Sequence, residues 1–150
     1  MSVTLSGSDT MVINNRVLAD LGDADAATLD FPNDIASAKT GKNGNTIYGL
    51  NETGKLCDVT IRVLRGSADD KFLNGLMSNQ NLNFAGFVLM TGEFIKKLGD
   101  GQGNITSDTY IMSGGIFKKR VNAKTNVEGD TEQSIAIYMM TFSNSPRVLT

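Results

Sequence analysis

The chain has 150 residues, about the length of one domain, with 14 Lys and Arg against 16 Asp and Glu, no His, no Trp and a single Cys. The absence of His excludes Ser–His–Asp and Cys–His catalysis and removes the commonest transition-metal ligand. The one Cys, Cys57, cannot form an intrachain disulfide.

The composition, 40% hydrophobic and 20% charged, is too apolar for a disordered chain, and its 16 Gly and 14 Asn indicate many turns. Apolar runs such as Phe87–Met90 are too short to span a membrane. The first residues lack the basic and apolar pattern of a secretory signal, so we expect the protein to be made and folded in a cytoplasm.

The N-terminal part of the chain is acidic. Residues 10–18 predict two short strands around an Asn–Asn turn, and an acidic, Ala-rich segment follows from Asp20 to Asp30. Residues 1–35 carry six acids and one base, a net charge of −5, whereas residues 36–150 carry ten acids and thirteen bases, a net charge of +3. In a self-assembling protein this asymmetry lets one subunit's acidic edge meet another's basic edge; in a monomer it is only solvated charge.

A strand broken at Pro32 comes next, over residues 28–36, as is typical of a sheet edge or a bulge. The polar segment Ser37–Thr46 that follows has two Lys and two Gly and no apolar anchor, so we expect a projecting loop that is mobile in the isolated subunit. Its fragment TGKNGNT lacks both the glycine spacing of a phosphate-binding loop and a hydroxyl after Lys42, so nucleotide binding is not predicted.

The clearest local pattern is a hairpin, Thr46–Asn51 with Leu56–Leu64, around a turn that contains Gly54. The second strand alternates between an apolar face (Cys57, Val59, Ile61, Val63) and the other face (Asp58, Thr60, Arg62, Leu64). This alternation predicts a half-buried strand, with Cys57 as a small buried hydrophobe rather than a reactive thiol.

A short amphipathic helix follows this strand. Ser67 is its predicted N-cap, and Asp69 and Asp70 in the first turn favour the helix dipole. The apolar stripe consists of Phe72, Leu73, Leu76 and Met77. We expect this stripe to pack on the sheet and the helix to end in the Asn-rich residues 78–81.

The remainder of the chain is β-rich. We expect a long strand or two over residues 83–96, broken near Gly92, and a turn at residues 100–104. Residues 109–121 predict a strand bulged at Gly114–Gly115, and residues 134–142, apolar on both faces, predict a well-covered strand. The expected fold is therefore mainly β and mostly antiparallel, with one short flanking helix.

No catalytic or metal-binding constellation emerges. Asp69 and Asp70 are better explained by helix capping than by acid–base chemistry, and the acids Asp20, Asp23 and Asp25 lack the pattern of a calcium loop. A basic cluster comprises Lys118, Lys119, Arg120 and Lys124. Because only one aromatic residue lies near it, a solvated edge or a subunit contact is favoured over nucleic-acid binding. We predict no enzyme and no cofactor.

The order of these elements resembles that of tail tube proteins of contractile-tailed bacteriophages, above all where strand 57–64 leads through Arg65, Gly66 and Ser67 into the helix. The resemblance spans essentially the whole chain. It implies one domain, residues 1–150, with a β-sandwich or half-barrel that forms hexameric rings stacked into the inner tail tube. It also implies a surrounding sheath, baseplate and tail-terminator partners, passage of double-stranded DNA during ejection, and a place in the virion tail after assembly in the host cytoplasm.

The resemblance also implies roles for particular residues. The loop that reaches the adjacent ring corresponds to Lys39, Thr40, Gly41, Lys42, Asn43, Gly44 and Asn45. Lumen-facing candidates are Asp58, Thr60 and Arg62, although Arg62 departs from an acidic lining, so either Asp58 offsets it or this face is not luminal. Subunit-contact candidates are Asp20, Asp23, Asp25, Lys118, Lys119 and Arg120. Both chain ends would lie at subunit or ring contacts, and the helix within reach of the sheath.

Two alternatives remain open. The tube of type VI secretion has a similar ring, and secretion context or neighbouring phage morphogenesis genes would separate the two. A β-sandwich ligand-binding module instead predicts a monomer with a concave, aromatic-lined pocket, for which seven Phe, three Tyr and no Trp offer little material.

Overall fold

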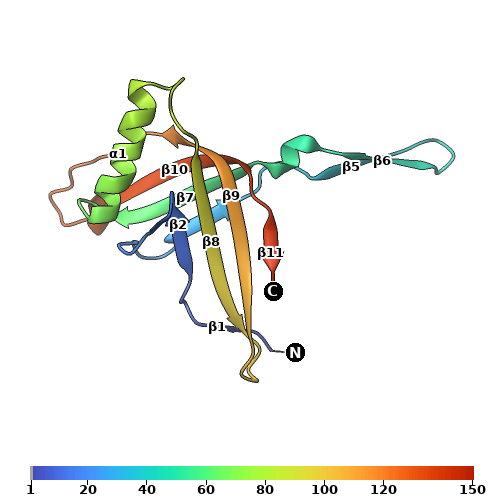
Figure 1. Ribbon diagram of the computed structural model, residues 1–150, viewed down its shortest axis with the longest axis horizontal. Helices are drawn as coiled ribbons and strands as arrows, with labels where there is room; N and C mark the ends of the chain where they lie inside the picture. Colours follow the sequence, from blue (N-terminus) through green and yellow to red (C-terminus); the bar gives the residue numbers. More distant parts are fainter. Residues whose placement is uncertain (1) are drawn as a thin grey trace.

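A twisted antiparallel sheet with one helix packed on it forms the body of the molecule, and a separate two-stranded ribbon extends from one end (Figure 1). The computed structural model describes residues 2–150. The strands of the main sheet are β1 (Thr4–Leu5), β2 (Thr10–Ile13), β3 (Arg16–Val17), β4 (Ala27–Asp30), β7 (Cys57–Leu64), β8 (Met90–Gly99), β9 (Ile105–Lys119), β10 (Ile135–Asn144) and β11 (Arg147–Leu149). The ribbon is β5 (Ala36–Thr40) with β6 (Thr46–Leu50), and the helical segments are η1 (Glu52–Lys55), α1 (Ala68–Leu82) and η2 (Thr131–Ser134).

The main sheet has the order β3-β2-β8-β9-β10-β7-β4, with β1 added on β8 and β11 on β9, and its strand pairs are antiparallel. The prediction of a mainly antiparallel β fold with one helix is confirmed. No helix within residues 2–150 is long and apolar enough to cross a membrane.

One core joins the sheet and the helix, and the strands present their alternate residues to it. The predicted inner face of β7 is at most 1% exposed: Cys57, Val59, Ile61 and Val63. Four alternate residues of β10 are equally buried: Ala136, Tyr138, Met140 and Phe142. The opposite face of β10, with Ile137 and Met139, is only half-buried, so the prediction that this strand is covered on both faces is wrong.

Helix α1 begins as predicted but continues beyond the predicted end. The Ser67 hydroxyl accepts a hydrogen bond from the Asp70 amide at 3.2 Å, which confirms the N-cap. The Asn-rich stretch stays helical to Leu82 because Gln80 is buried there. Its side chain donates to the Phe117 carbonyl at 3.0 Å and accepts from the Phe117 amide at 2.8 Å, so β9 holds the last helical turns in place.

The predicted hairpin between residues 46–51 and 56–64 is wrong. Strand β6 pairs with β5, and β7 pairs with β10 and β4. The residues between β6 and β7 form the short helix η1 instead of a turn, capped by the Asn51 side chain, which accepts from the Thr53 amide. Gly54 is buried there without a positive φ, and a Cβ on it would lie 2.7 Å from the Asp34 carbonyl oxygen. The glycine therefore marks a close approach between two backbones.

The strand predicted from residue 83 begins later, at Met90. The Asn83 side chain accepts from the Gly86 amide at 3.1 Å, which forms a turn after α1 in place of the extended backbone expected. The predicted bulge is present: Met90 pairs with Gly115 but Gly92 with Met112, so β9 carries one extra residue there.

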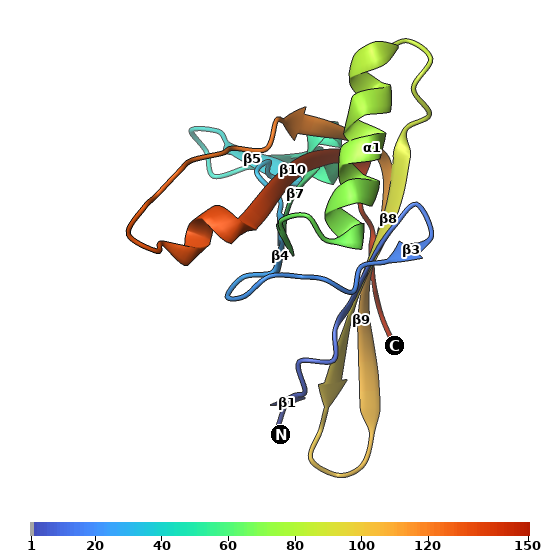
Figure 2. The ribbon, with the colours of Figure 1, turned by 90° about the vertical axis from the view of Figure 1, so that its left-hand side faces the viewer.

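Both ends of the chain pair with the long β8–β9 hairpin, which extends beyond the rest of the sheet (Figure 2). Strand β11, which the sequence patterns did not predict, lies along residues 108–110. Arg147 on β11 donates from Nε and Nη2 to the Asp108 carboxylate at 2.6 and 2.9 Å. These hydrogen bonds lower the pKa of Asp108 from its ordinary value.

Candidate functional site

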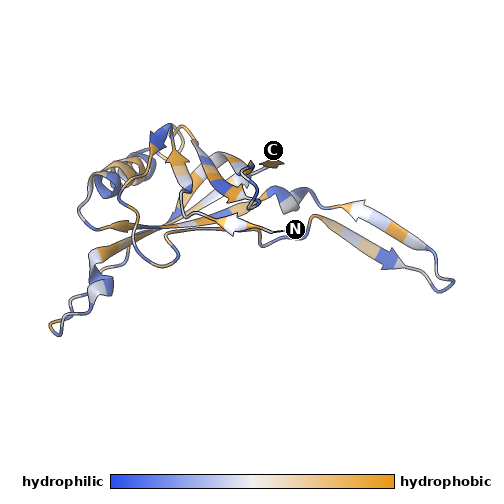
Figure 3. Ribbon diagram, turned by 90° about the horizontal axis from the view of Figure 1, so that it is seen from below, coloured by the Kyte–Doolittle hydropathy of each residue, from blue (hydrophilic) through white to orange (hydrophobic). Residues whose placement is uncertain are grey.

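The ribbon of β5 and β6 with its connecting turn, residues 36–50, projects from the body as an isolated arm (Figure 1). All ten residues of its two strands are exposed. Cross-strand pairs place Ala36 with Leu50 and Ala38 with Tyr48 on one face. Tyr48 and Leu50 are 78% and 76% exposed, which is far more than a sheet face normally leaves to water. The arm, which extends away from the body in Figure 3, thus presents an apolar face that its own chain does not bury.

The other face and the tip of the arm are mainly polar. Lys39 pairs with Ile47 on this face, and Lys42 lies in the tip, whereas residues 36–50 contain no acid. The tip is a tight turn in which the Gly41 amide donates to the Asn45 carbonyl at 2.8 Å. The segment Ser37–Thr46, predicted as a loop, is not a loop throughout: it contains most of β5, the tip and the first residue of β6. Residues 39–45 are the distal part of the ribbon.

The base of the arm is held by backbone contacts. The Asn51 amide donates to the Ile35 carbonyl at 2.9 Å, and the Asn51 side chain donates to the Asp34 carbonyl at 2.7 Å. Together with the close approach at Gly54, these contacts fix the direction in which the arm leaves the body.

The polar face of β7 is the second candidate surface. Asp58, Thr60 and Arg62 lie on one face, as predicted, opposite Thr141, Met139 and Ile137 of β10. Asp58 accepts from the Thr141 hydroxyl at 2.9 Å and lies 3.7 Å from the Lys118 ammonium nitrogen. The face is therefore a mixture of apolar, hydroxyl and charged groups.

Arg62 is neutralised, but not by Asp58. Its Nη2 donates to both carboxylate oxygens of Glu132, at 2.9 and 3.0 Å, and lies 3.5 Å from Asp23. The hydrogen bonds to Glu132 raise the pKa of the Arg62 guanidinium above its ordinary value. Asp58 instead lies near Lys118, so the partners of Arg62 are two acids from other segments of the chain.

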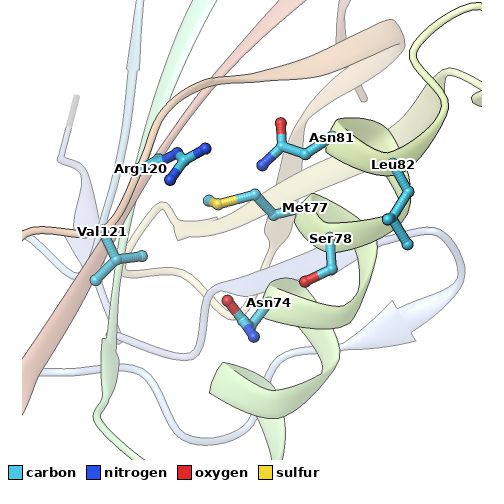
Figure 4. A pocket seen from close by; sticks show the side chains of 7 residues that line it. All are labelled: Asn74, Met77, Ser78, Asn81, Leu82, Arg120 and Val121. Atoms are coloured by element: carbon cyan, nitrogen blue, oxygen red, sulfur yellow. The ribbon is translucent and has the colours of Figure 1, made fainter.

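The subunit-contact candidates are not brought together within the chain. Asp25 and Lys119 are exposed, whereas Asp23 and Lys118 each have an intramolecular ion-pair partner. Arg120 lines a hollow of about 510 Å³ against helix α1 (Figure 4). Asn74, Ser78 and Asn81 face it from the helix, and no aromatic side chain lines it.

Asp69 has a role that the sequence pattern did not indicate. Its side chain is fully buried and accepts from the backbone amides of Ala19 and Asp20, both at 2.6 Å, and from Arg16 Nε at 3.1 Å. The neighbouring Asp70 accepts from the Tyr138 hydroxyl and from the Gly66 amide. Both carboxylates hold elements together, so neither has the free geometry of an acid–base pair. An acidic residue in the first turn of a helix has the same sequence pattern whether it favours the helix dipole or binds another segment. The sequence therefore did not reveal the contact of Asp69 with residues 16–20.

No protein-family model matches this chain, and no curated protein sequence matches it. Its fold is similar to solved structures. One is a chain from the sheath-tube complex, in the extended state, of the PVC extracellular contractile injection system, with a TM-score of 0.58 over 95% of this chain and 87% of that chain. Another comes from the sheath/tube terminator of the same system, with a TM-score of 0.56 over 95% of this chain and 92% of that chain. Sequence identity is 8% and 7%, so the likeness is one of fold.

Proposed function

We propose that this chain is the tube subunit of a contractile injection apparatus of the phage-tail type, and that it assembles into stacked hexameric rings. Its fold is similar to chains of a sheath-tube complex and a sheath/tube terminator, at nearly full coverage. The resemblance in element order supports the same role.

The uncovered apolar face of the arm is the observation that carries this proposal. Full burial of an apolar side chain stabilises by about 1.5–3 kcal/mol, so Tyr48 and Leu50 together offer roughly 3–6 kcal/mol to a contact that the monomer does not make. The main sheet also ends in two short strands, β3 and β4, which leave backbone groups for pairing with neighbours. A subunit with one projecting arm and two open edges is suited to repeated self-association.

In this proposal the arm, residues 36–50 with Lys39–Asn45 at its distal part, reaches the adjacent ring. The face with Asp58, Thr60 and Arg62 lines the lumen, and the acids Asp30 and Glu93 lie on the same side of the sheet. The positive charges of Arg62 and Lys118 are each paired with a carboxylate, which limits adhesion of double-stranded DNA during passage. Subunits meet laterally through the acidic segment around Asp20–Asp25 and the basic run Lys118–Arg120.

The remaining partners follow from the same role. Helix α1 faces outward toward a sheath, tube ends meet baseplate and terminator proteins, and the assembled protein resides in a virion tail. A type VI secretion-like tube is the alternative within this architecture, in which the cargo is protein rather than DNA. A monomeric ligand-binding module is disfavoured because the hollow in Figure 4 is open and has no aromatic walls.

Negative-stain electron microscopy and sedimentation at rising protein concentration test the proposal. We expect rings or tubes from the native chain. The double variant Tyr48→Ser/Leu50→Ser should remain a folded monomer, because the apolar face is lost. The matched control is Ile47→Ser, which removes an equally exposed side chain, 77%, from the opposite face of the same strand.

Deleting Lys39–Asn45 should block ring stacking more than subunit folding, since these residues contribute nothing to the core. A native chain that sediments as a monomer at high concentration, with no rings or tubes on the grid, would overturn the proposal. Loss of folding on deletion of residues 39–45 would show that the segment has a structural role instead.

A further inference from the structure

The arm and a second feature lie at opposite ends of the longest axis of the molecule. In Figures 1 and 3 the arm extends at one end, and the segment that joins β9 to β10, residues 120–134, projects at the other. These two parts cannot meet within one chain. A contact between the arm of one copy and this segment of another is head-to-tail, and such contacts repeat along one direction unless the rotation between copies closes them into a ring.

A groove lies at the base of this segment, with a volume of about 290 Å³. We call it the far-end groove, and its lining includes Arg65, Ala123, Lys124, Glu132, Ile135 and Ile137. Hydrogen bonds fix the shape of the groove: Arg65 donates to the carbonyls of Asn122 at 2.8 Å and Gln133 at 2.9 Å. These bonds hold both ends of the segment against the start of β10 and keep the groove open.

The charges of the two features are complementary. The arm carries +2, from Lys39 and Lys42 without any acid. The segment, residues 120–134, carries two bases, Arg120 and Lys124, and three acids, a net charge of −1, and Lys124 is paired with Asp130. Glu132 lines the groove and remains 53% exposed at its side chain while it binds Arg62.

The groove also fits one anchor of the arm by size. A volume of about 290 Å³ equals that of roughly ten liquid waters, which is room for one large side chain but not for the whole ribbon. Tyr48 is the largest side chain on the apolar face of the arm, and Tyr is among the residues that dominate binding energy at interfaces. Ala123, Ile135 and Ile137 supply apolar walls for a ring.

We propose that the far-end groove receives the arm of a second copy, with Tyr48 seated in it and the two lysines directed toward the acidic segment. The inference rests on the proposed function and names the receptor for the arm. It makes the polymer polar: one end of each tube displays unfilled grooves, and the other displays free arms.

Cysteine pairs test this contact in the assembled protein. Ala38→Cys lies directly across the ribbon from Tyr48 on the apolar face, and Ala123→Cys lies in the groove; both positions are exposed, so folding is preserved. A disulfide requires Cα atoms within about 7 Å. Oxidation of the double variant should give a ladder of covalent multimers on a non-reducing gel, because every copy carries both halves of the contact. The matched control pairs Ala123→Cys with Ser37→Cys, the neighbouring position on the other face of the arm, and should give no ladder.

A second measurement does not depend on thiol chemistry. Ala123→Arg should raise the concentration needed for assembly at least tenfold, whereas Asn79→Arg, at an exposed position of helix α1, should change it less than twofold. Tubes that form normally from Ala123→Arg, or ladders that are equal for the Ala38 and Ser37 pairs, would overturn the groove assignment and leave the proposed function standing. Absence of rings and tubes from the native chain would overturn both.

Discussion

The buried carboxylate of Asp69 offers a sharp test of how the helix is attached to the sheet. In the variant Asp69→Asn the side chain keeps its shape, but one acceptor oxygen becomes an amide group with two donors. The N–H groups of Ala19 and Asp20 both bond to the same carboxylate oxygen, Oδ2, at 2.6 Å, so the side-chain carbonyl of the variant keeps these bonds while the new amide faces Arg16 Nε without an acceptor. A donor left without a partner at a buried site costs about 1–3 kcal/mol, and loss of charge weakens the remaining bonds further.

Loss of the ion pair with Arg16 adds little to this cost in stability, because the Arg16 side chain is 40% exposed and regains water when the carboxylate is removed. We therefore expect Asp69→Asn to lower the free energy of unfolding by about 2–3 kcal/mol. For a chain of this length, that loss corresponds to a decrease in Tm of roughly 4–12 °C.

The assay is urea and thermal unfolding followed by circular dichroism, at a protein concentration at which sedimentation shows no assembly. Asp25→Asn is the matched control, since it makes the same chemical change at an exposed carboxylate, and it should stay within about 0.5 kcal/mol of the native chain. If Asp69→Asn proves as stable as Asp25→Asn, the carboxylate does not hold α1 to the segment after β3, and the reasoning from its three hydrogen bonds fails.

Three further predictions concern other elements. Gly115→Ala should destabilise by more than about 1 kcal/mol in urea unfolding, because its Cβ would lie 2.4 Å from an aromatic ring of β10, whereas Gly75→Ala, in open space on α1, should stabilise by about 0.5–1 kcal/mol. The Asp108–Arg147 pair should stabilise the fold above the unfolded pKa of Asp, about 3.9, and this stabilisation should be lost as the pH falls through the lowered pKa of the folded state. The acid unfolding curve of Arg147→Ala should lack this contribution, and curves that superimpose for the variant and the native chain would contradict the assignment. Burial raises the pKa of the Cys57 thiol to about 11, so iodoacetamide at pH 8 should label it, as detected by mass spectrometry, only after unfolding in urea.

The alternation of β7 and the N-cap of α1 were predictable because both depend on residues close in sequence. Val59 and Ile61 alternate with polar neighbours whatever the partner strand is, and Ser67 caps the helix through an amide three residues away. Fold class and the bulge at Gly114–Gly115 follow from the same local signals.

The partner of β6 was not predictable in this way. Residues 46–51 and 56–64 flank a glycine-containing turn, and this arrangement fits the pattern of a hairpin. In the structure, however, β6 pairs with β5, the strand that precedes it in the chain. The deciding contact is the close approach of Gly54 to the Asp34 backbone, which joins positions twenty residues apart. The extension of α1 through its Asn-rich turn likewise depends on the hydrogen bonds between Gln80 and Phe117 of β9. Helix propensity cannot predict these bonds, because it depends only on residue type.

The candidate site was found from the sequence only in part. The segment around Lys39–Asn45 was identified as projecting because it is polar, yet the chemistry of the arm lies in Tyr48 and Leu50, which were assigned to a strand of the body. Their exposure becomes evident only when the cross-strand register is known, since it places both on one face that its own chain leaves uncovered. The far-end groove depends on three-dimensional placement of residues 65, 123 and 137, which no spacing in the sequence reveals.

The isolation of the arm has a consequence for assembly. A two-stranded ribbon without a packed face is only marginally stable in water, so the free subunit gains little from holding it in one conformation. The contacts at Asn51 and Gly54 fix only its base, and the strands beyond depend on five cross-strand pairs. Docking on another copy buries Tyr48 and Leu50 but must also offset the entropy of ordering the ribbon. The first contact is therefore weak and later ones are strengthened by neighbours already in place, so we expect assembly to show a lag that preformed tubes abolish.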